Sequence, residues 1–358
     1  MRIVKLKTSL TTHKFYFELW PQILNEIEKT ENGEDFILDF SDIDAIDGTA
    51  IPNLLNVARI VIRDKNIVPQ IYITNISKKN KLTWYLEWIG FFDVCDFYQF
   101  YEVNTMRISA KRSFEEASTY IFVENAKTDS ESERARIENS VLKKITNNSY
   151  YSFWEKWVNF NINVSENEFF NCVERMIRNL CVNTGIHTEE YSILVLQSNK
   201  KNKKLLISVA DCGKGFYSSF CNKKVKTKDG TEKYYETVSI PREEFIKLKG
   251  SDADLYAIVE ALCYRFDSNV YGLYHVLLRT IEEEGILRIH SNRKRVVLTA
   301  KNCKSLKTAS TVQKFAAKLL LYAKSQYVSQ DTFQYPGVHI ELEIPYVKEK
   351  IFDGSLEN

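Results

Sequence analysis

The sequence has little of what marks fibrous, low-complexity or strongly charged chains. Its 358 residues include only 12 glycines and 6 prolines, and the apolar and charged fractions, 44% and 27%, are typical of a globular protein. Neither sign of charge is in clear excess, because 49 Lys and Arg residues against 47 Asp and Glu residues leave a formal net charge of +2. We therefore expect no nucleic-acid partner that is recognised through an overall basic field.

Paired cysteines and long apolar runs are missing as well. The seven cysteines form no C-x-x-C pair and have no histidine at zinc-ligand spacing, so we interpret them as reduced thiols of a cytoplasmic protein. Residues 1–17 lack the apolar core of a signal peptide, and no uncharged stretch approaches the roughly 18 residues of a membrane span. The sequence predicts neither export nor contact with a membrane.

The length predicts two domains, because single hydrophobic cores stop growing near roughly 250 residues. The first, residues 1–105, alternates apolar runs of strand length with amphipathic helices. The apolar runs lie at 36–40, 68–74 and 91–101, and the helices are predicted around 51–62 and 79–89. This alternation predicts an α/β domain with a partly parallel sheet.

A connector and a second pattern follow. Residues 106–148 carry serine and charges of both signs at helical spacing, which favours a charged helical connector with a solvated face over a partner-binding helix. From 149 to 358 long helices stand beside adjacent antiparallel strands, which predicts an α+β two-layer sandwich. The predicted helices are 168–183, 252–264 and 274–284, and the predicted strands are 191–197, 205–210, 286–290, 295–300 and 339–344.

The most informative segment is LLISVADCGKGF, residues 205–216. An apolar strand ends in a carboxylate, Asp211, and Gly213 and Gly215 follow at a spacing of two. Glycines of this kind allow backbone to come close to a ligand, and the carboxylate can accept hydrogen bonds from it. An ordinary Asp/Gly turn is the alternative interpretation.

Other residues stand in a suggestive order around this segment. Asn179 and Asn183 share one face of the predicted helix 168–183, although asparagine is a mediocre helix former. Gly272 and Leu273 introduce a helix whose first amides can receive phosphate. The last predicted strand, HIELEIP, follows a Pro-Gly-Val segment.

Between about 168 and 345 this order of elements resembles the GHKL (gyrase, histidine-kinase and mismatch-repair) ATPase superfamily with its Bergerat fold. The resemblance implies ATP and Mg²⁺ as ligands. It implies that Asn179 ligates Mg²⁺ with Asn183 beside it, that Asp211 accepts from the adenine amino group, that Gly213 and Gly215 shape the adenine pocket, and that Gly272 and Leu273 lie in the loop around the phosphates. Mg²⁺ held by few protein ligands and by phosphate is the usual arrangement for this ion.

The position of a catalytic base departs from that family. Members that hydrolyse ATP commonly carry a glutamate four residues before the metal-binding asparagine, and Arg175 stands there. Glu174 lies five residues before Asn179, which places it about 140° away around a regular helix, so it needs a helix bulge to serve as general base. Val338 also replaces the threonine that often follows the late glycine. We therefore expect nucleotide binding, and hydrolysis only if Glu174 is reoriented.

The segment FILDFSDIDAIDGTAIPNLL, residues 36–55, resembles the STAS domain of anti-sigma-factor antagonists. In that family a strand, a short loop and a helix present a phosphorylatable hydroxyl, and Thr49 matches its position. A phosphate there would meet the helix N-terminus favourably. The alternative, which we favour for the hydroxyl itself, is that Thr49 caps the helix or lies in its first turn.

Together the resemblances imply an ATP-binding bacterial regulatory protein, an anti-sigma-type or other nucleotide-gated switch, with a protein partner bound through the STAS-like domain. Two other functions stay open at this point. One is a catalytically silent scaffold that uses both folds only for protein contacts. The other is a phosphoryl-transfer enzyme, such as a serine/threonine-kinase-like protein, with Glu174 as base.

Overall fold

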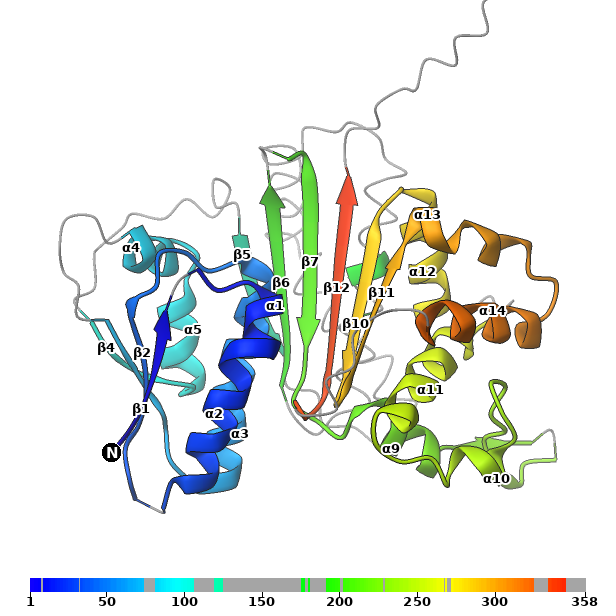
Figure 1. Cartoon of the computed structure of the whole chain (residues 1–358), viewed down its shortest axis with the longest axis horizontal. Coiled ribbons are helices and arrows are strands. Elements are labelled where there is room, and N and C mark those ends of the chain that lie inside the picture. The colour runs from blue at the N-terminus through cyan, green and yellow to red at the C-terminus, as the bar shows by residue number, and fades with distance from the viewer. Residues whose placement is uncertain are drawn as a thin grey trace, which may run out of the picture.

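The computed structural model describes residues 1–7, 9–31, 33–73, 81–105, 119–124, 175–177, 180, 191–199, 202–227, 229–266, 268, 272–324 and 334–345. Within these residues it is a mixed α/β structure with a four-stranded sheet, a six-stranded sheet and a two-stranded ribbon. Figure 1 shows the six-stranded sheet in the middle of the molecule, with helices on both sides of it. No helix in the described part of the chain is both long enough and apolar enough to cross a membrane.

The four-stranded sheet belongs to the N-terminal part of the chain and is parallel throughout, in the order β1-β2-β3-β4. Its strands are β1 (Arg2–Lys7), β2 (Phe36–Asp42), β3 (Gln70–Tyr72) and β4 (Glu102–Asn104). The prediction of a parallel sheet in this region is confirmed. The first strand was not predicted, because its partner in β2 lies more than thirty positions further along the chain.

Helices connect these parallel strands. They are α1 (Thr12–Lys14), the π-helical turn η1 (Phe15–Leu19), α2 (Trp20–Lys29), the 3₁₀ turn η2 (Gly48–Ala50), α3 (Ile51–Lys65), α4 (Lys81–Trp88) and α5 (Phe91–Tyr98). Asp47 begins η2 and accepts a hydrogen bond from the Thr49 backbone N–H, while Asn66 ends α3 in the left-handed conformation. The apolar run 91–101 forms mainly the helix α5 and not a strand. This helix follows Gly90, whose φ is 75°. Phe91, Phe92 and Cys95 supply its buried face.

The six-stranded sheet is antiparallel, in the order β11-β10-β12-β7-β6-β5. Its strands are β5 (Thr119–Glu124), β6 (Ser192–Asn199), β7 (Lys204–Ala210), β10 (Ile286–Ser291), β11 (Lys294–Thr299) and β12 (Val338–Pro345). Strand β12 lies in the interior and joins the β6–β7 hairpin to the β10–β11 hairpin. Strand β5, with the sequence TYIFVE, lies inside the predicted connector 106–148. It was not predicted, because the charged residues around this short segment favoured a helix.

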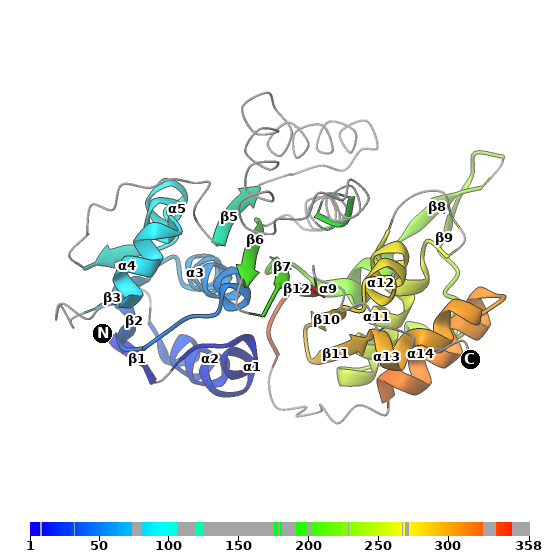
Figure 2. The same cartoon turned by 90° about the horizontal axis from the view of Figure 1, so that it is seen from above.

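The remaining elements pack mainly on one face of this sheet (Figure 1). They are α9 (Gly215–Asn222), β8 (Lys224–Lys226), β9 (Glu232–Tyr234), α10 (Arg242–Phe245), α11 (Gly250–Cys263), α12 (Leu273–Glu282), α13 (Ala300–Cys303), η3 (Lys304–Thr308) and α14 (Val312–Lys324). These helices and the sheet form two layers in this part of the chain. The N-terminal part adds a third layer on the opposite face, as Figure 2 also shows.

The six-stranded sheet consequently contributes side chains to two cores. In β6, Leu194 and Leu196 pack in the helix-side core, whereas Ile193 and Val195 pack with the N-terminal helices. This is the two-residue period of a strand covered on both faces. Strand β12 alternates in the same way, with Ile340, Leu342 and Ile344 in the helix-side core. We call its other face the N-terminal face of the sheet.

Candidate functional site

The loop after β7 places a buried carboxylate at the end of the sheet. The backbone N–H of Asp211 still donates to Val338 O of β12 at 2.9 Å, so the ladder continues one residue beyond β7. Asp211 is 4% exposed, and its Oδ1 accepts from the Gly213 N–H at 2.8 Å. By the two-residue alternation, Asp211 follows Val209 on the helix side of the sheet. Asp211 therefore lies at the strand end with a buried carboxylate.

Gly337 supports this loop from the neighbouring strand. Its φ is +94°, and a Cβ at this position would lie 2.1 Å from Asp211 O and 2.7 Å from Asp211 C. Because both contacts are with backbone, no side chain can be accommodated without moving the Asp211 loop. The late glycine of the sequence pattern thus has a direct steric role at the carboxylate.

At the other end of the loop, Gly215 packs closely against the β10–β11 turn. Its φ is +74°, and a Cβ would lie 2.4 Å from Asn292 Nδ2. Asn292 Nδ2 donates to Asp254 Oδ1 at 3.1 Å, and the Arg293 N–H donates to Asp254 Oδ2 at 3.1 Å. Burial raises the pKa of the Asp254 carboxyl above its ordinary value, and these two hydrogen bonds oppose the rise. Asp254 was not predicted as a site residue, because it lies on α11 and its partners lie in the β10–β11 hairpin.

Helix α12 begins at the same end of the sheet. Strand β10 runs parallel to β7, because both are antiparallel to β12, and residues 283–285 turn α12 back into β10. The start of α12 therefore lies near the end of β7. The Phe216 N–H donates to Ser291 Oγ at 3.2 Å, which shows that the end of β10 meets the loop after Asp211. The structure thus brings Asp211, Gly213 and Gly215 to the end of the sheet where α12 starts.

Gly272 is buried and precedes Leu273, the first residue of α12. Its N–H donates to His275 Nδ1 at 3.2 Å, and a Cβ here would approach Arg265 Cγ at 2.7 Å. Burial lowers the pKa of His275, so the ring is a neutral acceptor at neutral pH.

The structure does not describe the predicted metal and base residues. Glu174, Asn179 and Asn183 lie outside the described residues. Arg175 is exposed, while Met176, Ile177 and Leu180 are buried in the helix-side core. In the described ranges, no group of three His, Cys, Asp or Glu side chains is arranged to hold a metal ion.

A buried glutamate on α11 anchors the polar insert 217–249. Glu260 is fully buried and accepts from Tyr235 O–H at 2.7 Å, from the Val238 N–H at 3.0 Å, and from both the N–H and the hydroxyl of Ser239, at 3.1 and 2.8 Å. Burial raises the pKa of the Tyr235 phenol, and the adjacent Glu260 charge raises it further. The insert is therefore fastened to α11 through one carboxylate. Sequence analysis did not identify Glu260, since these partners are more than twenty residues away.

Thr49 lies on the N-terminal face of the sheet, opposite the Asp211 loop. Its hydroxyl is 2.8 Å from the Thr12 hydroxyl, and its carbonyl accepts from Ser208 Oγ at 3.1 Å. Thr49 is 7% exposed and lines a cavity of about 270 Å³ together with Lys204 and Arg295. It occupies the first turn before α3, and Asp47 provides the cap.

A polar cluster joins the N-terminal helices to this face. His339 Nε2 lies 2.7 Å from Ser208 Oγ, whose proton goes to Thr49 O, so Nε2 carries the imidazole proton. The other nitrogen, Nδ1, then accepts from Tyr16 O–H at 2.7 Å and from Asn53 Nδ2 at 3.0 Å. Burial, assisted by the Arg295 charge, lowers the pKa of His339 to about 3. A neutral histidine therefore connects the two parts of the chain.

Comparisons of this chain with protein-family models, with curated proteins and with solved structures find no match.

Proposed function

We propose that the chain is an ATP-binding regulatory protein in which a GHKL-type module with a Bergerat fold and a STAS-like module share one sheet. The observation that carries this proposal is the Asp211 loop. A buried carboxylate ends an interior antiparallel strand, Gly213 and Gly215 follow it, and Gly337 holds its backbone from the adjacent strand.

Each part of this end of the sheet has a role in the proposal. Asp211 accepts from the adenine amino group, and Gly213 and Gly215 allow the ring to approach the backbone. The first amides of α12, after Gly272 and Leu273, face the phosphates. Asn179, with Asn183 beside it, is proposed to hold Mg²⁺, which neutralises phosphate charge when bound.

The layered arrangement favours a switch over transfer of phosphate to Thr49 in the same chain. Thr49 packs against the N-terminal face of the sheet, whereas Asp211 follows Val209 on the helix side. A change at a nucleotide bound on the helix side can be transmitted to the STAS-like module through strand β7. Ser208 on this strand contacts Thr49, and Asp211 directly follows the strand. A protein partner would then respond to the state of the STAS-like module.

Titration calorimetry of the full chain with Mg-ATP tests the proposal. We expect saturable binding that Asp211→Asn weakens at least about tenfold, because the amide replaces one acceptor oxygen with a donor. Asp44→Asn, at an exposed position in the N-terminal part, is the matched control and should bind as the wild type does. No binding by the wild type, or equal binding by the Asp211→Asn variant, would refute the nucleotide site.

A catalytically silent scaffold is the second candidate, and the tight junction between the two parts favours it. Trp20 Nε1 donates to Gln334 O at 2.9 Å, and Arg63 Nη1 donates to Cys212 O at 3.0 Å. ATP turnover that Asn179→Ala abolishes would exclude a scaffold. Turnover that Glu174→Gln removes while ATP affinity is retained would instead identify a phosphoryl-transfer enzyme.

A further inference from the structure

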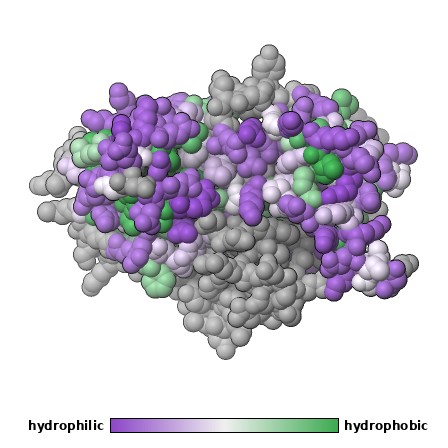
Figure 3. Space-filling view, turned by 90° about the horizontal axis from the view of Figure 1, so that it is seen from below, coloured by the Kyte–Doolittle hydropathy of each residue, from purple (hydrophilic) through white to green (hydrophobic). Residues whose placement is uncertain are grey.

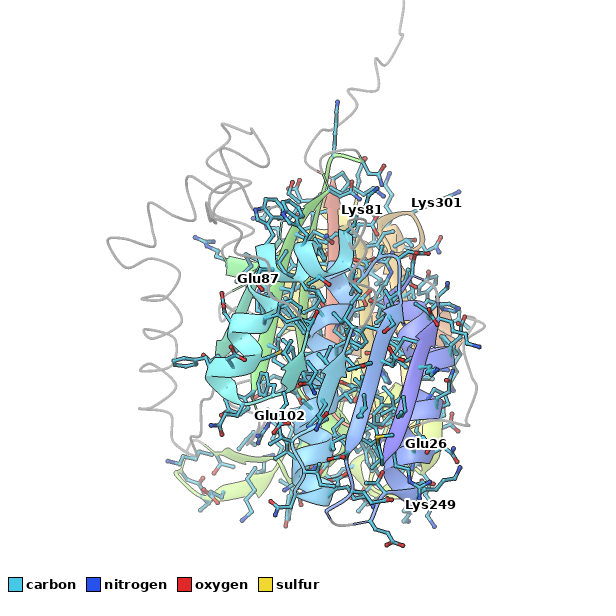
Figure 4. All side chains as sticks on the ribbon, turned by 90° about the vertical axis from the view of Figure 1, so that its left-hand side faces the viewer. Glu26, Lys81, Glu87, Glu102, Lys249 and Lys301 are labelled. Atoms are coloured by element: carbon cyan, nitrogen blue, oxygen red, sulfur yellow. The ribbon has the colours of Figure 1, made fainter. Side chains whose placement is uncertain are left out.

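A second cavity lies around the start of α11, at the end of the sheet that carries the Asp211 loop and not beside Thr49. Its volume is about 510 Å³, within the range of small-molecule sites. Its lining comes from three separate parts of the chain: Lys249, Gly250 and Ser251 at the start of α11, Arg293 and Lys294 in the β10–β11 hairpin, and Lys324 at the end of α14. Figure 4 shows Lys249 at the lower end of the molecule, and Figure 3 shows that the described surface of this end is mostly hydrophilic.

Lys294 is the most informative residue of this cavity. It is only 7% exposed, it lines the cavity, and within the described residues its ammonium group makes no hydrogen bond or ion pair. The packed part of this side chain is its aliphatic stem, while Nζ keeps access to solvent beside the cavity that the residue lines. The cavity therefore presents a cation that a negatively charged ligand would complete.

The other charged residues of the cavity strengthen this field. Lys249 and Lys324 are exposed, and Lys324 Nζ is held 3.1 Å from the Tyr256 hydroxyl. Arg293 is fixed by its backbone N–H, which donates to Asp254. One carboxylate, Asp252, also lines the cavity, and it is exposed in the first turn of α11. Among the described residues that line the cavity, four are cations and one is an acid.

The start of α11 supplies backbone donors to the same place. The helix has 14 residues, and its cap residue, Lys249, makes no side-chain cap hydrogen bond, so no cap side chain covers the first amides. Gly250 has a φ of +60°, and no heavy atom lies within 4 Å of the position of a Cβ. Open space, unshared amides and the positive end of the helix dipole are the features that bind oxyanions.

We propose that this cavity binds the phosphate groups of a small polyphosphorylated molecule. Its size accommodates more than one phosphate, and its lysines come from the start of α11, the β10–β11 hairpin and the end of α14. The site is separate from the proposed nucleotide site, because none of its described lining residues belongs to 211–215 or to α12. The two sites are neighbours through Asn292, which contacts both Gly215 and Asp254 and directly precedes Arg293.

Calorimetry of the full chain with sodium tripolyphosphate tests the site. We expect saturable binding that weakens with added salt. Lys294→Met should weaken it at least about tenfold, or about 1.4 kcal/mol, and Lys294→Arg should retain it. Lys314→Met, on the same helix as Lys324 but outside the cavity, should bind as the wild type does.

Two further arms make the outcome decisive. Lys324→Met removes an exposed side chain and cannot act by unfolding the protein, so it should also weaken binding by several-fold. Asp211→Asn should leave tripolyphosphate binding unchanged even if it abolishes ATP binding, which separates this site from the proposed nucleotide site. The proposal is overturned if the wild type does not bind tripolyphosphate, or if Lys294→Met and Lys324→Met both bind it as the wild type does. It is also overturned if the wild type binds vesicles that contain phosphoinositides but not free tripolyphosphate.

Discussion

Replacing Gly337 with alanine is the sharpest test of how the Asp211 loop is built. The left-handed φ of +94° costs a non-glycine residue about 1–2 kcal/mol. The added methyl group would also sit 2.1 Å from Asp211 O, and forcing extra volume into packed structure costs about 1–3 kcal/mol. We therefore expect Gly337→Ala to lower the free energy of unfolding by about 2–5 kcal/mol and to displace the loop.

Gly33→Ala separates the two contributions. Gly33 has a similar φ of +86°, but nothing lies within 4 Å of the position of its Cβ, so only the conformational cost of about 1–2 kcal/mol remains. Urea unfolding followed by far-ultraviolet circular dichroism measures both variants. If Gly337→Ala is destabilised no more than Gly33→Ala, the backbone contact with Asp211 does not exist as described. Loss of Mg-ATP affinity in Gly337→Ala alone would link the steric contact to the proposed site.

Two other predictions concern buried polar groups. Burial keeps the folded-state pKa of His339, about 3, below the ordinary value of about 6.5, so its contribution to stability is present above pH 6.5 and is lost as the pH falls toward 3. Between pH 7.5 and 5 this histidine should lower the free energy of unfolding by about 2 kcal/mol. The variant His339→Gln should show a loss of stability over this range that is smaller by that amount. If the loss is unchanged in the variant, other groups are responsible for it. Glu260→Gln should weaken the hold on residues 217–249 by about 1–3 kcal/mol and speed tryptic cleavage there, whereas the exposed control Glu244→Gln should not; equal cleavage of both variants would contradict the anchoring role.

The sequence is most informative where one local segment carries both pattern and function. The end of β7, Asp211 and the start of α12 lie close to their predicted positions, since alternation, a terminal carboxylate and a glycine before a helix are local signals. The helix α5 shows the limit of such signals. A short apolar run is compatible with a buried strand or a buried helix, and the turn at Gly90 decides between them.

Interactions across the chain could not be predicted in this way. Asp254 and Glu260 look like ordinary surface acids of a helix, and only the folded structure shows the backbone amides that they bind. His339 and Glu341 in HIELEIP likewise alternate as solvent-facing residues would, yet they are 1% and 4% exposed beneath the N-terminal part. Burial by a distant segment leaves no local mark on composition.

The interior position of β12 has a consequence for how the protein is made. This strand occupies positions 338–345 of 358 residues, yet it separates the two hairpins of the six-stranded sheet. A ribosome adding about 5–20 residues per second must therefore translate as far as residue 345 before the sheet can close. Until then the facing edges of β7 and β10 remain unpaired, which exposes them to other nascent chains. A premature stop before codon 338 would remove the strand that joins both hairpins.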